Sequence, residues 1–531
     1  MIQKIGKDKI RVETLWTGIY CVLMFLVFPL YFQNNYIDIL DAKTKFFLWA
    51  TVIYCVGAVL LRAYGMVRGR MAPDVKGKKN PEVLFTLWLL AGILIPLLLS
   101  DNRKTILWAY DGKQFGAVIL LLCLAVYWLI GKTFSWNEIL IRSICVGAGI
   151  VFILAFLNRY GIDPLGMYEN LVENQRDEFL STIGQMNVLS GYVSIFLPFF
   201  MGMFWKAKDR WEKMLFGFMI FFGTMAGVCS NSDSFFVVIV LCMVVYLWFS
   251  LDFAEGIVTF AGMVLSVSLG MLFLQFVGGQ IPFHASWRSV QKAVVQKIPW
   301  AVVCIILALL WMILKKRQVT VDNLKTKKVI LVLLGVIAVA GIVLILYQNV
   351  TAKPGQTGML LFNDAWGTNR GYVWKRTIEL YGDLPLHQKL FGVGLGGFSK
   401  FFYPYYEESI ALFGYYFTDA HNEFLQIMVT TGLVGVIGYI GLIVTTIVKC
   451  LKERKRMQIV IASVVVAYVL QAVFNNPLVF TTPYLFLFMG ISNAACSSSE
   501  EQEETTICDG KTEIKKDTPH KRKKKTKQNR I

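Results

Sequence analysis

Long runs of apolar residues alternate with short charged connections through most of this chain. The run VILVLLGVIAVAGIVLIL at 329–346 is one example, and similar runs recur from 14–32 to 478–495. An α-helix needs about 20 such residues to cross the hydrocarbon core of a bilayer. The pattern therefore predicts an all-α polytopic integral membrane protein with about 14 transmembrane helices.

One connection is much longer than the others, and it divides the chain into four parts. We predict an N-terminal transmembrane bundle of about 11 spans at 1–348 and a long extracytoplasmic loop with short helices at 349–420. C-terminal spans follow at 421–496, and a disordered basic cytoplasmic tail occupies 497–531. A loop of this length is typical of a functional segment.

Charge predicts the orientation of the spans. Lys and Arg total 53 against 35 Asp and Glu, and they gather in the connections at 62–79, 206–213, 315–328 and 449–456. The positive-inside rule places these connections and both termini in the cytoplasm. The chain is thus expected to be a multi-pass protein of the cell inner (plasma) membrane. Topology explains the net charge of +18, so no nucleic-acid partner is expected.

Membrane lipids are the partner that the basic tail indicates, since KRKKKTK at 521–527 fits anionic head groups. The ten Cys all fall in predicted spans or cytoplasmic segments, so no disulfide is expected. The four His and the Cys show no metal-ligand spacing, and the sequence predicts a protein without a metal or cofactor.

Two polar stretches lie at membrane depth. STIGQMNVLSGY at 181–192 and CSNSDS at 229–234 interrupt the apolar pattern. Polar side chains there are costly unless they face a neighbouring helix or a cavity. They are expected either to bond helices together or to line a site for a polar substrate.

The long loop carries three patterns. A helix is expected at 372–381, with Trp374, Ile378 and Tyr381 on one face and Arg376 and Glu379 on another. KLFGVGLGGF at 389–398 has four glycines that permit close backbone approach to a ligand, but it lacks the dinucleotide-binding spacing. FFYPYYEESIALFGYYF at 401–417 holds nine aromatics, which fit either an interfacial belt or flat faces for sugar rings.

The stretch DAHNEFLQIMVTTGLVGVIGYIG at 419–441 joins the loop to a long apolar helix. We expect His421 in the first turn, where the helix dipole favours its neutral, proton-accepting form. Asp419 is expected to cap the helix or to orient the ring, and Asn422 to cap or to hold substrate. Glycines every third residue from 432 to 441 predict close packing by a neighbour. A straight helix over 421–448 would be roughly 42 Å long.

Four pieces of the sequence together resemble the bacterial O-antigen ligase and O-antigen polymerase superfamily. They are NRGYVWKRTIEL at 369–380, the segment from Pro385 to Phe398, DAHNEFLQIMVTTGLVG at 419–435 and, more weakly, STIGQMNVLSGY. The resemblance implies a glycosyltransferase at the outer face of the membrane. Its donor would be an undecaprenyl-pyrophosphate-linked oligosaccharide and its acceptor a glycan or lipid, with polymerisation favoured slightly over ligation.

Roles follow from this resemblance together with the chemistry of the side chains. His421 is the expected base and Arg370 the expected phosphate contact, since a guanidinium offers paired donors and stays charged. The expected substrate-binding residues are Asn422, Arg376, Gly394, Gly396, Arg288 and Arg176. The family often has a Ser-Arg pair near the hinge where this chain has Ser232-Asp233, so Arg159, Arg176 or Arg288 is expected to replace that arginine.

A multi-span transporter or flippase of polysaccharide or lipid-linked sugar is the alternative function. It predicts ionisable residues spread through the bundle core, whereas the candidates here gather at one face. A non-catalytic partner in envelope assembly is a third reading.

Overall fold

A computed structural model describes residues 12–67, 81–109, 113–253, 255–280, 288–317, 323–353, 356, 358 and 360–494. These residues are almost all helical, which confirms the predicted all-α class. Their one sheet is an antiparallel pair, β1 (Phe179–Leu180) and β2 (Gly184–Gln185), with Phe179 opposite Gln185. The predicted tail at 497–531 lies outside the described residues.

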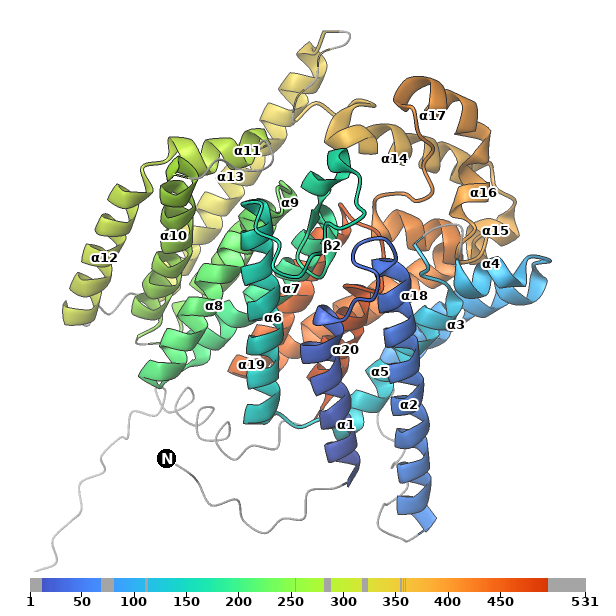
Figure 1. The fold of residues 1–531 in the computed structure, drawn as a ribbon, viewed down its shortest axis with the longest axis horizontal. Coiled ribbons are helices and arrows are strands. Elements are labelled where there is room, and N and C mark those ends of the chain that lie inside the picture. Colours follow the sequence, from blue (N-terminus) through green and yellow to red (C-terminus); the bar gives the residue numbers. More distant parts are fainter. Residues whose placement is uncertain are drawn as a thin grey trace, which may run out of the picture. The chain divides into compact units, whose positions relative to one another are not determined.

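Helices follow one another with short connections, and the long helices dominate the fold (Figure 1). The N-terminal ones are α1 (Val12–Val22), extended by turns to Leu30, α2 (Ile39–Val67), α3 (Pro81–Leu99), α4 (Arg103–Trp108), α5 (Ala117–Thr133), α6 (Glu138–Arg159) and α7 (Met186–Lys206). Next come α8 (Arg210–Cys229), α9 (Ser234–Ser250), α10 (Gly256–Gln280), α11 (Ser289–Lys292), α12 (Trp300–Arg317) and α13 (Asn323–Thr351). The last are α14 (Trp366–Asp383), α15 (Leu386–Phe391), α16 (Phe398–Phe402), α17 (Tyr406–Phe413), α18 (Glu423–Glu453), α19 (Arg456–Ala472) and α20 (Thr482–Asn493).

Nine helices of the described part are long and apolar enough to cross a membrane, or ten if the bent pair that ends in α12 counts as one span. The predicted count of about 14 is therefore not confirmed. Three further apolar helices, α5, α9 and α19, have 17 residues each, and α20 has 12, so length alone does not qualify them as spans. Their apolar character made them resemble spans in the sequence.

The helix α18 is broken at Gly432, whose φ of 70° and ψ of −177° are not helical. The carboxylate of Glu423 accepts hydrogen bonds from the hydroxyls of Tyr439 and, at 2.8 Å, of Tyr468. In a straight helix, residues 423 and 439 would lie about 24 Å apart, too far for their side chains to meet. The first segment of α18 therefore turns back beside the second, and the predicted straight helix of roughly 42 Å is wrong.

Glycines of α18 pack against α3, as the three-residue spacing predicted. A Cβ on Gly438 would lie 2.5 Å from the Leu89 nitrogen, and a Cβ on Gly92 would lie 2.7 Å from Gly435 Cα. Backbones approach this closely only where both helices present small residues.

Residues of α14, of α16, of the chain before α18 and of the first segment of α18 form a second, small apolar cluster. Its buried side chains are Tyr372, Val373, Phe398, Phe402, Phe417, Ala420 and Val429. The expected apolar face of α14 is only partly right, because Ile378 is 58% exposed while Tyr372 and Val373 are buried. The kink at 367–369 sets this rotation, since these three residues have left-handed backbone angles.

We expect Gly438→Ala to destabilise the protein by about 1–3 kcal/mol, because the new methyl group would collide with the backbone of α3. Gly341→Ala in α13 is the matched control, since a Cβ there has open space and alanine favours helix. Thermal unfolding of the detergent-purified protein measures both. Equal unfolding temperatures for the two variants would contradict the close packing of α3 on α18.

Candidate active site

His421 lies just before α18 rather than in its first turn, which corrects the sequence prediction. The helix begins at Glu423, and Asn422 is its N-cap, with its side-chain oxygen accepting from the Leu425 amide at 3.0 Å. His421 itself has a φ of 47°, in the left-handed region that side chains other than glycine seldom occupy. A residue held in such a conformation at a helix entrance is typical of a functional site.

Asp419 orients the His421 ring. One carboxylate oxygen lies 3.2 Å from the ring nitrogen Nδ1, and it also accepts from the His421 amide and from the side-chain amide of Asn476. Asp419 is only 4% exposed, whereas the His421 side chain is 37% exposed. With Nδ1–H facing the carboxylate, Nε2 is left as the proton acceptor.

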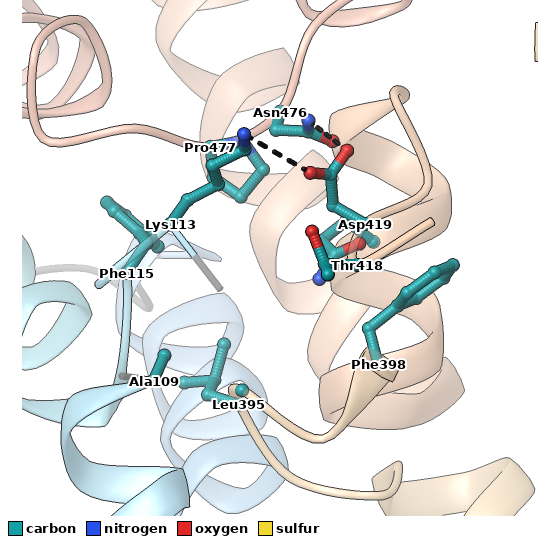
Figure 2. Close-up of a pocket in the computed structure, with 11 residues that line it drawn as sticks. Ala109, Lys113, Phe115, Leu395, Phe398, Thr418, Asp419, Asn476 and Pro477 are labelled. Carbon is teal, nitrogen blue, oxygen red and sulfur yellow. Dashed lines mark hydrogen bonds and ion pairs between the residues drawn. The ribbon is translucent and has the colours of Figure 1, made fainter. Parts of the chain in front are cut away.

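Lys113 completes this group, with its ammonium 3.7 Å from the second Asp419 oxygen. Figure 2 shows Lys113 and Asn476 converging on Asp419 from two different parts of the chain. The carboxylate lines a small pocket together with Thr418, Phe398 and other residues of the loop. A buried carboxylate with three partners holds its neighbour rigidly.

Burial lowers the pKa of His421 below its ordinary value, and Arg370 and Lys113 lower it further. Asp419 acts in the opposite direction. Burial alone would raise the pKa of Asp419, but His421, Lys113 and the Asn476 hydrogen bond together lower it. The pair is therefore a neutral imidazole beside an ionised carboxylate at neutral pH. Burial, rather than the helix dipole invoked from the sequence, is the main cause.

Arg370 lies close to this pair. It follows the left-handed residues 367–369, and one of its terminal nitrogens donates to the Gly367 carbonyl at 2.6 Å. Its Nε is buried and has no hydrogen-bond partner. Burial and then Arg288 lower the pKa of Arg370, while Asp419, Asp233 and Tyr415 raise it. A bound anion would supply the hydrogen-bond acceptor that this buried donor lacks.

Of the three arginines expected to replace the missing hinge arginine, Arg288 fits best. Its backbone amide donates to the Asn231 side chain at 3.0 Å, which fixes it on the hinge at 229–234. It is also close enough to Arg370 to lower the pKa of that side chain. Arg159 is 2% exposed and uses two nitrogens on the Cys229 carbonyl, and Arg176 lies farther out in the loop after α6.

Arg376 has partners within the loop. It forms ion pairs with Glu379 at 2.9 Å and Glu408 at 3.1 Å, and it lies over the rings of Tyr372 and Tyr405. Hydrogen bonding to Glu379 raises the pKa of Arg376. These contacts join α14 to α17, so Arg376 is placed to hold the loop together.

The glycine-rich loop approaches the protein's own backbone. The Val393 and Gly394 amides donate to the Val429 and Thr430 carbonyls at 3.0 Å each. A Cβ on Gly394 would lie 2.5 Å from Ile106, and one on Gly396 would lie 2.6 Å from the Thr105 carbonyl. Two amides of this loop thus pair with carbonyls next to the break in α18, and Gly396 also lines the small pocket.

The polar stretches at membrane depth bond elements together. The Gln185 side chain caps α7, and Ser232 donates to the Asn187 side chain at 3.1 Å. Gln471 of α19 donates to Ser190 of α7 at 3.2 Å. These contacts favour the helix-bonding alternative of the two that the sequence left open.

Sequence reasoning missed Lys113 and Asn476, and it included Tyr415 only as one of the nine aromatics at 401–417. The Asn369 side chain donates to the Tyr415 hydroxyl at 2.9 Å, and Phe417 lies between Tyr415 and His421, with ring centroids at 5.1 Å and 6.2 Å. Tyr415 is 44% exposed. The Asn-Asn-Pro interruption at 475–477 and the lone lysine before an apolar run were the available signals, but neither indicates its partner.

Part of the chain is similar to a known protein family. Residues 295–440 match the family model described as O-Antigen ligase, a range that includes Arg370, the glycine-rich loop and His421. No curated protein matches the chain. The match confirms the resemblance drawn from the motifs, and several helices qualify as membrane spans. Through residues 295–440 the chain is similar to the O-antigen ligase and O-antigen polymerase superfamily, which supports a membrane enzyme of polysaccharide synthesis.

Proposed function

We propose that this protein transfers a glycan from undecaprenyl pyrophosphate to a hydroxyl of the acceptor, with His421 as general base. The Asp419–His421 pair carries the proposal: a buried carboxylate holds Nδ1 and leaves Nε2 of a neutral ring, 37% exposed, free to accept a proton. The family implies a lipid-linked oligosaccharide and a glycan acceptor as substrates.

In this mechanism the acceptor oxygen attacks the anomeric carbon, and its proton moves to His421 Nε2. The bond from that carbon to the phosphate oxygen breaks, and the electron pair leaves on undecaprenyl pyrophosphate. Arg370, with its unpaired Nε, and the neighbouring Arg288 stabilise the charge that develops on the leaving group. Direct attack inverts the configuration at the anomeric carbon.

The other expected residues have supporting roles. Asn422 caps α18, while Arg376, Gly394 and Gly396 fix the loop around the site. The half-exposed ring of Tyr415 is close to Arg370 and offers a flat face to the sugar next to the phosphate. The same chemistry serves a polymerase or a ligase, since the two differ only in the acceptor; we favour the polymerase.

The first test compares His421→Ala and Arg370→Ala with wild type, using lipid-linked oligosaccharide purified from the host cell. We expect each variant to lose about 10²–10⁴-fold in transfer rate, because base catalysis and leaving-group stabilisation are each of this size. His387→Ala and Arg210→Ala are matched controls at exposed positions, and they should keep full activity. Wild-type rates in both test variants would refute the proposed mechanism.

A second test is the pH dependence of transfer. The base must be neutral, so the rate should fall as pH decreases through the His421 pKa, which burial places below 6.5. Lys113→Met removes a cation that lowers the pKa of His421, and it should move this acid limb to higher pH. Asp419→Asn removes the carboxylate that raises that pKa, and it should move the limb to lower pH while reducing the rate. Shifts in the same direction for both variants would contradict the assignment of the acid limb to His421.

A third test concerns the sugar face. Tyr415→Ala should raise KM for the donor by about 5–20-fold, as expected when an aromatic contact of roughly 1–2 kcal/mol is lost. Tyr415→Phe keeps the ring and should stay near wild type. Tyr403→Ala, at a tyrosine that is 65% exposed, is the control. An unchanged KM in Tyr415→Ala would exclude this role.

A further inference from the structure

A second cavity, of about 290 Å³, opens beside the connection that follows α6. Its volume is close to the lower end of the about 300–1,000 Å³ range of small-molecule pockets. Charged and aromatic side chains line it, among them Arg159, Asp163, Tyr168, Glu169, Arg176 and Asp177. Neither the base nor the phosphate contact of the proposed function belongs to this cavity.

Fixed contacts hold the wall of the cavity in place. Arg159 donates to the Cys229 carbonyl at 2.9 Å and 2.6 Å, which ties the end of α6 to the hinge. Tyr168 donates its hydroxyl to the Phe179 carbonyl at 2.8 Å, and its amide donates to one oxygen of Asp163 at 2.8 Å. A cavity with such a wall is present before a ligand arrives, which lowers the entropic cost of binding.

The charge of the lining argues against an anion. Two guanidinium groups, Arg159 and Arg176, face three carboxylates, Asp163, Glu169 and Asp177. A phosphate would meet this excess of negative charge, and like charges at close range repel. A neutral ligand avoids that cost.

The free hydrogen-bonding groups indicate what kind of neutral ligand fits. The second oxygen of Asp163 is buried and accepts no hydrogen bond. A buried acceptor of this kind needs a donor, and the exposed guanidinium of Arg176 can donate to an acceptor on the ligand. Each hydroxyl of a sugar ring is both a donor and an acceptor, so a sugar satisfies both walls at once.

The cavity also adjoins the candidate active site. Arg159 lines the cavity, and Arg288 lies near Arg370, the proposed phosphate contact, because it lowers the pKa of that side chain. Both Arg159 and Arg288 bond to the hinge at 229–234. A glycan whose phosphate lies at Arg370 and Arg288 therefore has a polar, carboxylate-rich cavity next to it.

We propose that this cavity is a sugar-binding subsite that holds a neutral ring of the glycan substrate; the inference rests on the proposed function. It also changes the role expected for Arg176, which donates to sugar hydroxyls rather than to pyrophosphate.

The test uses the full chain in detergent with Asp163→Asn, Arg176→Gln and Glu169→Gln, and Glu173→Gln on the same loop is the control. We expect KM for one glycan substrate to rise about 5–20-fold with kcat unchanged, since these contacts bind ground state and transition state alike. A rise in KM for the donor assigns the ring to the donor, and a rise in KM for the acceptor assigns it to the acceptor. Values equal to those of Glu173→Gln for both substrates would overturn the proposal.

Binding measurements separate this proposal from the catalytic one. The same substitutions, made in the His421→Ala background, should weaken equilibrium binding of the affected substrate while leaving the affinity for inorganic pyrophosphate unchanged. Weaker pyrophosphate binding would instead make the cavity an anion site and refute the sugar assignment. Full activity of His421→Ala would refute the role of His421 as general base. The binding measurements would still decide whether the cavity binds a sugar. If Asp163→Asn unfolds at lower temperature because Tyr168 loses its partner, the exposed Arg176 and Glu169 variants decide the outcome.

Discussion

The fold-back of α18 at Gly432 is the constraint on which the site depends. A break in a helix leaves carbonyls without amide partners, and buried carbonyls must be paired. The glycine-rich loop pairs two of them through the amides of Val393 and Gly394. The buried Glu423 secures the turned-back segment, because it accepts from hydroxyls of α18 and α19. His421 therefore lies next to a rigid support rather than at the free end of a long helix.

This support explains how a left-handed backbone at His421 persists. A conformation of that kind costs of order 1–3 kcal/mol and survives only where its surroundings hold it. Asn422 fixes the helix start on one side, and buried Asp419 binds both the amide and the ring of His421 on the other. Asn476, which follows α19, adds a further restraint on the same carboxylate. Three side chains thus determine the position of one imidazole.

Sequence patterns predicted the helical membrane class, which the described helices confirm. Local motifs selected the long loop, His421 and Arg370, and their roles stay predictions. The sequence patterns did not predict the break in α18. Gly432 shares its three-residue spacing with glycines that pack against α3, and spacing alone does not distinguish a packing glycine from one at positive φ. Lys113 and Asn476 were missed because tertiary packing brings them to Asp419. The ion pair of Arg376 with Glu379 followed from helical spacing, whereas its contact with Glu408 did not.

The two regions that a lipid-linked glycan would occupy differ in charge. Burial and the guanidinium of Arg288 lower the pKa of Arg370. An anion bound there would relieve the repulsion between these two cations. In the cavity beside α6 the carboxylates outnumber the guanidinium groups, so an anion is repelled and a neutral ring is favoured. Arg159 and Arg288 meet on one hinge, which keeps the two regions next to each other. The phosphate of the donor and a neutral sugar ring of the glycan would then be oriented by opposite electrostatic preferences.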